Sequence, residues 1–245
     1  MQVSSRNLVP PLRQGDQGLG IRRLLEVDNC DSQLWAGGDW GAGIYQICVG
    51  TDRDTPSVRA IKDWAFGNCS GLVTAILNDG LEEIGERAFY GCALVRIDIP
   101  PSVRAIQTWA FYECSGLTTV ILNDGVEEIG ERAFYGCVLV RINIPPSVRA
   151  IQAWAIEDCP GLTTVILNDG LDVIGTGAFK GCALVHIDIP PSVRDIDVAA
   201  FEENSNLTNV QFCNEIEDFV SGESMQHWWN HGVHEKCLST YSFFV

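Results

Sequence analysis

Basic side chains are scarce in this sequence. Lysine and arginine together number 16 against 32 aspartates and glutamates, and the formal net charge is −16. Such a charge would repel nucleic acid and anionic membranes. We therefore expect no nucleic-acid partner. We expect another protein as the partner, with a weak preference for one that presents a basic surface.

Long apolar runs and an export signal are also missing. No stretch approaches the ~20 apolar residues that cross a bilayer, so no membrane span is expected. The first residues, MQVSSRNLVPPLRQG, contain neither the apolar core nor the cleavage pattern of a secretory signal. The expected location is the cytoplasm, where the ten cysteines would remain thiols.

Signatures of catalysis are absent as well. The sequence has no phosphate-binding glycine loop and no G-x-S-x-G motif. It has no C-x-x-C pair and no Cys/His cluster with zinc spacing. We expect a protein that is not an enzyme and that holds no cofactor and no metal.

One histidine cluster leaves a metal-binding alternative open. His227 and His231 are four residues apart, and His234 follows with Glu235 beside it. On a helix the first two would share a face and could bind a divalent metal. Gly232 would end that helix before the third histidine, which favours an aromatic-rich terminal cap with no metal.

An internal duplication dominates the rest of the chain. Residues 78–122 recur as residues 123–167 with eight differences, among them Asp98/Asn143 and Phe111/Ile156. Each copy divides into two halves that share the skeleton L-x-x-(V/I/A)-x-L/I, a turn, V/L-x-x-I, and A-F-x-x-C. The leucine that begins this skeleton recurs every 22 or 23 residues, at Leu72, Leu94, Leu117, Leu139, Leu162, Leu184 and Leu207. A fixed period of this length indicates a fold built by stacking coils.

The repeated run LTTVIL, IPPSVRAI and AFYGC resembles the leucine-rich repeats of BspA-like and treponemal surface proteins, over roughly residues 56–213. The resemblance implies a solenoid with an interaction role and no reaction chemistry. The predicted fold is a leucine-rich-repeat solenoid of about seven coils. A parallel β-sheet would form one side, and short helical or 3₁₀ turns would form the other.

Composition and periodicity predict four parts in the chain. Residues 1–20 are expected to be a flexible arm, residues 21–55 an N-terminal cap, residues 56–212 the solenoid and residues 213–245 a C-terminal cap.

Equivalent positions in successive coils predict columns of like or complementary residues. A cysteine column is expected inside the solenoid at Cys69, Cys92, Cys114, Cys137, Cys159 and Cys182. Arginines are expected to stack between indoles at Trp64, Arg87, Trp109, Arg132 and Trp154. Charges of opposite sign alternate at Arg59, Glu82, Arg104, Glu127, Arg149, Asp172 and Arg194. We interpret these columns as structural.

Alternation along the strands predicts which side chains face outward from the sheet. The predicted partner-binding face, on the concave side of the stack, consists of Thr74, Ile76, Arg96, Asp98, Thr119, Ile121, Arg141, Asn143, Thr164, Ile166, His186 and Asp188. Isoleucine recurs there on every second strand, which suits apolar anchors between polar groups. Simple β-propensity on a duplicated template explains the isoleucines equally well. The predicted function is a protein-interaction scaffold, with a surface-adhesion module, self-association or metal binding in the C-terminal cap as alternatives.

Overall fold

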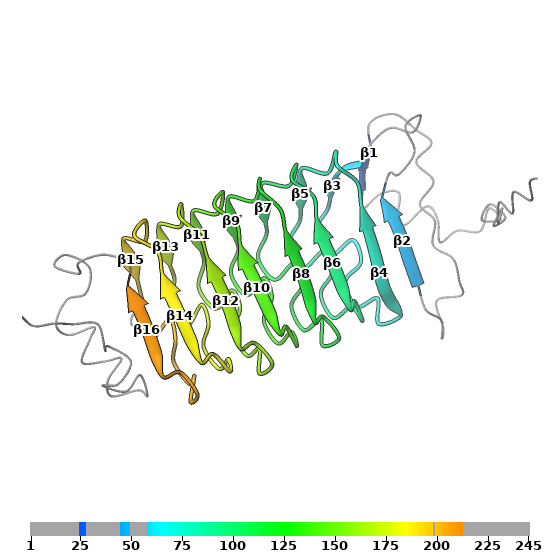
Figure 1. The fold of residues 1–245 in the computed structure, drawn as a ribbon. Coiled ribbons are helices and arrows are strands. Elements are labelled where there is room, and N and C mark those ends of the chain that lie inside the picture. The colour runs from blue at the N-terminus through cyan, green and yellow to red at the C-terminus, as the bar shows by residue number, and fades with distance from the viewer. Residues whose placement is uncertain (1–24, 28–44, 50–57, 198, 213–245) are drawn as a thin grey trace, which may run out of the picture.

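The computed structural model describes residues 25–27, 45–49, 58–197 and 199–212. Across them the chain winds into similar coils that stack in one row, and each coil adds one rung to each of two β-sheets (Figure 1). The predicted solenoid is therefore confirmed. Within the described residues no helix has the length and apolar character that crossing a membrane requires.

The first sheet contains the even-numbered strands, and we call it the even-strand sheet. All of its pairings are parallel, and its order follows the chain from one end of the stack to the other. Its strands are β2 (Tyr45–Val49), β4 (Leu72–Leu77), β6 (Arg96–Ile99), β8 (Thr119–Leu122), β10 (Arg141–Ile144), β12 (Thr164–Leu167), β14 (His186–Ile189) and β16 (Asn209–Phe212).

A second sheet, which the sequence did not predict, contains the odd-numbered strands. Most of these have only two residues, and they pair parallel because each coil repeats the V/L-x-x-I segment in register. The strands are β1 (Leu25–Val27), β3 (Val58–Ile61), β5 (Glu83–Ile84), β7 (Ala105–Ile106), β9 (Glu128–Ile129), β11 (Ala150–Ile151), β13 (Val173–Ile174) and β15 (Asp195–Ile196). β1 pairs antiparallel with β3 at the edge of this odd-strand sheet.

The short helical or 3₁₀ turns expected opposite the even-strand sheet do not occur in the described residues. The segment around A-F-x-x-C instead forms turns whose backbone groups bond alternately within and between coils. The N–H groups of Trp64 and Phe66 donate to the carbonyls of Glu86 and Ala88, one coil later, at 2.9 and 2.8 Å. The intervening Ala65 N–H donates within its own coil, to Lys62, at 3.1 Å. These bonds to the next coil take donors that a helix would use internally.

Aromatic rings form the centre of the core. The side chains of Phe89, Phe111 and Phe134 are fully buried, and their ring centroids are 5.2 Å apart from one coil to the next. Ile156 continues this column, and Phe179 and Phe201 resume it at 5.7 Å. A single isoleucine therefore interrupts an otherwise continuous column of phenylalanine rings.

The predicted cysteine column is confirmed, and the structure adds a bonding role. Each buried thiol lies against the backbone carbonyl of the aromatic or aliphatic core residue one coil earlier. Cys92 Sγ is 3.0 Å from the Phe66 carbonyl, and Cys114 Sγ is 3.0 Å from that of Phe89. A thiol is a weak donor, so each cysteine fills core volume and also occupies a carbonyl.

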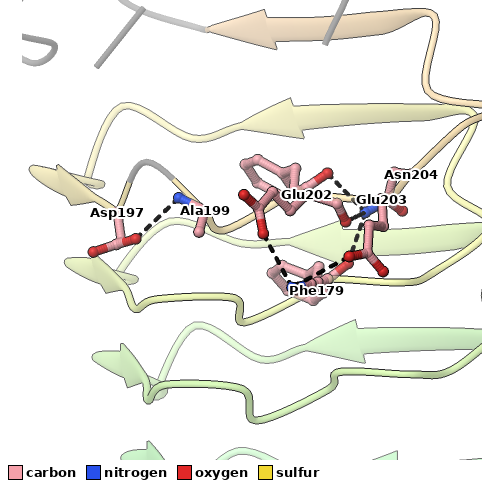
Figure 2. A network of polar contacts seen from close by, with 8 residues as sticks. Phe179, Asp197, Ala199, Glu202, Glu203 and Asn204 are labelled. Carbon is pink, nitrogen blue, oxygen red and sulfur yellow. Dashed lines mark hydrogen bonds and ion pairs between the residues drawn. The ribbon is translucent and has the colours of Figure 1, made fainter. Parts of the chain in front are cut away.

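Asn204 takes the cysteine position in the coil that ends the described repeat. It is one of two buried polar side chains among the described residues. Its amide nitrogen donates to the carbonyl of Phe179 at 2.7 Å, the contact that a thiol makes elsewhere (Figure 2). Its amide oxygen accepts from the N–H of Leu184 at 3.3 Å. Asparagine therefore extends the column with stronger hydrogen bonds.

Because the thiols are buried, the protein is expected to lose stability at alkaline pH. Burial raises the pKa of the Cys114 thiol to about 12, and it raises the pKa of Cys92 and Cys137 too. A hydrogen bond with Cys182, together with burial, raises the pKa of Cys159. Below about pH 8.5 the thiols are protonated in both states, so their stabilising contribution is complete. At higher pH the unfolded chain loses protons that the folded chain retains, and stability falls.

We therefore expect the urea midpoint to decrease between pH 8.5 and 11. Each of these four thiols would contribute up to about 1.4 kcal/mol per pH unit. A Cys114→Ala variant should show a shallower decrease than the wild type. If the urea midpoint decreased with pH equally steeply in both proteins, Cys114 would not contribute to the pH dependence.

Turns of sequence NDG and PPS join the two sheets. The amide of Asn123 donates to the carbonyl of Ile99, one coil earlier, at 2.8 Å. The N–H of Gly125 donates to the hydroxyl of Ser147, one coil later, at 3.0 Å. Gly125 has a φ of 140°, and Gly170 repeats it with 122°, positive values that glycine adopts without a Cβ clash. These turns connect each coil to both neighbours.

The predicted arm (1–20) and C-terminal cap (213–245) lie outside the described residues. Of the predicted N-terminal cap, only β1 and β2 are described. The division of the chain into arm, caps and solenoid stays a prediction.

Candidate interaction face

The outward positions of the even-strand sheet lie in straight rows across the coils. The parallel register places Arg96 beside Thr74 and Thr119, and Arg141 beside Thr119 and Thr164. In the next row Asp98 lies beside Ile121 and Asn143 beside Ile166. None of the twelve residues predicted for this face is buried, while Ile97 and Val120 between them point into the core. The predicted residues thus share one face, and their role in binding stays a prediction.

Three exposed valines enlarge the apolar part of this face. Val95, Val140 and Val185 directly precede β6, β10 and β14, and they are 46%, 55% and 48% exposed. The coils between carry threonine at that position, as at Thr118. Strict alternation does not predict the exposed valines, because it would not place two successive side chains on one face. Their recurrence beside Arg96, Arg141 and His186 was the available signal.

Valines and isoleucines together form a checkerboard. Ile121 and Ile166 are half-buried and lie on coils without a valine at that position, while Ile76, 41% exposed, shares its coil with the half-buried Val73. From β6 to β14 an apolar side chain therefore appears on every coil, alternately at the start and near the end of the strand. Apolar groups spaced in this way between polar ones are typical of a protein-binding surface.

The polar groups on the face pair mostly along their own strands. Arg96 contacts Asp98 at 3.1 Å on β6, and His186 Nε2 contacts Asp188 at 2.7 Å on β14. On β10 asparagine replaces the aspartate, and Asn143 Oδ1 accepts a hydrogen bond from Asn168 at 3.0 Å. The face therefore consists of aliphatic side chains among polar groups that pair along their own strands, with an exception at β10.

Family comparison agrees with this architecture. A model of the BspA type leucine rich repeat region matches residues 51–163 and 127–223, which is more than half of the chain. The chain belongs to the BspA-type leucine-rich repeat family. A comparison with curated proteins found no match.

Solved structures of bacterial leucine-rich repeat proteins resemble this BspA-type chain. One, from Bacteroides ovatus, is 28% identical over 76% of this chain, with a TM-score of 0.62. The T. pallidum leucine-rich repeat protein is also 28% identical, covers 69% of each chain and has a TM-score of 0.53. This chain spans about half, 53%, of the length of the Bacteroides ovatus structure. The predicted family resemblance is confirmed.

The predicted columns form on other surfaces of the BspA-type solenoid. The guanidinium of Arg87 lies 3.4 Å from the ring centroid of Trp109 and 5.2 Å from that of Trp64. Arg132 lies 4.3 Å from the ring of Trp154, whose indole then packs directly against Gly177. These contacts join successive coils, which supports a structural role for the column.

The alternating charge column is confirmed in part. Arg59 pairs with Glu82 at 3.8 Å, and Arg104 pairs with Glu127 at 2.6 Å. All four side chains are more than half exposed, so each pair contributes little to stability.

A tyrosine column, which the sequence did not predict, also forms. The rings of Tyr90, Tyr112 and Tyr135 stack with centroids 5.1 and 4.6 Å apart. A hydrogen bond to Asp158 raises the pKa of Tyr135 to about 12. The column ends where Glu157 replaces tyrosine in the second copy.

The metal-binding alternative concerns His227, His231 and His234, which lie outside the described residues. Among the residues that are described, no three His, Cys, Asp or Glu side chains gather as metal ligands would.

Proposed function

We propose that this chain is a non-catalytic scaffold that binds a protein partner on the outward face of the even-strand sheet. The checkerboard of exposed valines and partly exposed isoleucines carries the proposal. An alternating row could arise from β-propensity alone. That explanation does not account for Val95, Val140 and Val185, which lie before the strands and are about half exposed.

Rigidity of the face supports the same function. Its side chains stand on parallel strands whose inward residues, such as Ile97 and Ile142, are almost completely buried. A face that is held in place before a partner arrives loses little conformational entropy on binding. The family is one of repeat scaffolds, which agrees with a binding function. The cytoplasmic location stays a prediction.

The proposal predicts that a double variant, Ile121→Asn with Val140→Thr, no longer captures the partner. Both replacements already occur at equivalent positions, at Asn143 and Thr118, so the fold should tolerate them. Immobilised wild-type protein should retain specific proteins from a lysate of the source cells, identified by mass spectrometry, and the variant should not.

A matched control alters the other side of the molecule. Gln107→Glu changes an exposed side chain directly after β7 and should leave capture unchanged. If the double variant captured the same proteins as the wild type, binding on the even-strand sheet would be ruled out.

A further inference from the structure

One cation on the even-strand sheet has no partner among the residues that the structure describes. Every other arginine or lysine that the structure describes makes a hydrogen bond, ion pair or ring contact, as Arg96 does with Asp98 and Arg149 does with the Gly170 carbonyl. The exposed guanidinium of Arg141, on β10, makes none with the described residues. It is the exception on a face where Arg96 pairs with Asp98 and His186 pairs with Asp188.

A single difference between the two copies leaves Arg141 unpaired. On β6 the sequence RIDI places Asp98 two residues after Arg96, and the two side chains form an ion pair. On β10 the sequence RINI places Asn143 there, and its oxygen accepts from the amide of Asn168. The duplication thus supplies the arginine without the carboxylate that neutralises it elsewhere.

No other group on the face replaces that carboxylate. The cross-strand neighbours of Arg141 are Thr119 and Thr164, which are uncharged. Asp98 and Asp188 lie two strands away, about 9–10 Å at the usual strand spacing. Each is already engaged, with Arg96 and His186 respectively.

Apolar side chains lie near Arg141 in addition to its threonine neighbours. Val140 directly precedes it and is 55% exposed, more than the other exposed apolar side chains of the described residues. Ile121 and Ile166 lie on the two flanking strands, β8 and β12. The guanidinium presents several N–H donors, and a bound partner would exclude water from the aliphatic groups near it. A charge-assisted hydrogen bond is strongest where water is excluded.

We propose that Arg141 is the receptor for a carboxylate of the protein partner, an aspartate or glutamate flanked by aliphatic residues. The proposal rests on the proposed function and adds the partner's chemistry. The aliphatic neighbours would contact Val140, Ile121 and Ile166, and the carboxylate would complete the ion pair that Asn143 does not provide. Arg141 would then set which partner binds and in which register.

The net charge of −16 does not oppose this recognition. At the outward positions of β6 to β14, Arg96 and Arg141 balance Asp98 and Asp188. The acidic excess therefore lies elsewhere, and salt screens it beyond about 8 Å at physiological ionic strength. The weak preference for a basic partner drawn from net charge does not describe this face.

A random-peptide display library selected on the full chain would test the proposal. Wild-type protein should select peptides enriched in aspartate or glutamate beside aliphatic residues. The key variant is Asn143→Asp, which gives β10 the sequence of β6 and so supplies Arg141 with its own carboxylate. The fold should be preserved, because β6 carries this pair and an aspartate can still accept from Asn168.

Affinity for a synthetic copy of the best peptide would then be measured by fluorescence anisotropy. Asn143→Asp and Arg141→Ala should each weaken binding about 10- to 100-fold, the range expected for a hydrogen bond to a charged group. Replacing the acidic residue of the peptide with its amide should have a similar effect. Asp98→Asn, which frees Arg96 without touching Arg141, should not weaken binding.

The outcomes separate this inference from the proposed function. The receptor role of Arg141 would be overturned if no acidic residues were enriched, or if Asn143→Asp bound the peptide as the wild type does. In that case loss of binding in the Ile121→Asn, Val140→Thr variant would still support partner binding on the outward face of the even-strand sheet. Unchanged binding in that double variant as well would contradict both the receptor role of Arg141 and the proposed binding face.

Discussion

Replacing Phe111 with alanine is expected to lower the free energy of unfolding by about 3–5 kcal/mol. The ring is completely buried and stacks at 5.2 Å on both Phe89 and Phe134. Its loss would leave a cavity in the centre of the stack and remove two ring contacts, each worth about 0.5–1.5 kcal/mol beyond the buried area. Urea denaturation followed by circular dichroism would measure the change.

The chain supplies its own control for this substitution. Phe111→Ile introduces the residue that occupies the same position in the second copy, at Ile156, where it is also completely buried. Since the cavity would be largely filled, we expect a loss of only about 1–2 kcal/mol, chiefly from the ring contacts. Equal losses for alanine and isoleucine would show that cavity volume does not determine stability here.

The period made much of this fold predictable. Because equivalent residues of successive coils contact each other, one correct alignment of the repeat places every column at once. Alternation then separated inward Ile97 from outward Arg96 and Asp98, as the structure confirms. The alignment of the repeat also predicted that Arg87 would lie between Trp64 and Trp109.

The turn segment was predicted wrongly because its decisive bonds are not local. Residues such as E-R-A-F suit a helical turn by local propensity. In the structure Arg87 has a φ of 54° and Trp109 a φ of 57°, values that a right-handed helix does not contain. The N–H of Phe89 donates to the carbonyl of Ala110 in the next coil, at 2.8 Å. Only the stacked neighbour makes that conformation favourable.

The candidate face was predictable in outline and not in its chemistry. The twelve residues followed from alternation, but the exposed Val95, Val140 and Val185 break that rule. The pairing of Arg96 and the isolation of Arg141 depend on which group a side chain finds in three dimensions. In the sequence, Asp98/Asn143 is one of eight differences between copies, and nothing there distinguishes it from the others.

Gly125→Ala is expected to destabilise the protein by at least about 3 kcal/mol. At a φ of 140° the backbone is in a region that is nearly restricted to glycine, and occupying it costs another residue about 1–3 kcal/mol. A Cβ there would also lie 1.9 Å from the carbonyl oxygen of Pro101, in the preceding coil. Relieving that contact means separating two coils at a turn that links both sheets. Thermal and urea unfolding would measure the loss.

Gly136 provides the matched comparison, because its positive φ of 68° leaves room for a side chain. A Cβ there would meet nothing closer than 3.6 Å, and Asp158 takes the equivalent position one coil later with a φ of 53°. We expect Gly136→Asp to cost only about 1 kcal/mol, the strain of a left-handed residue. The two glycines thus separate steric contact between coils from backbone strain within one. A Gly125→Ala variant as stable as Gly136→Asp would mean that neighbouring coils can move apart at the NDG turn with little loss of stability.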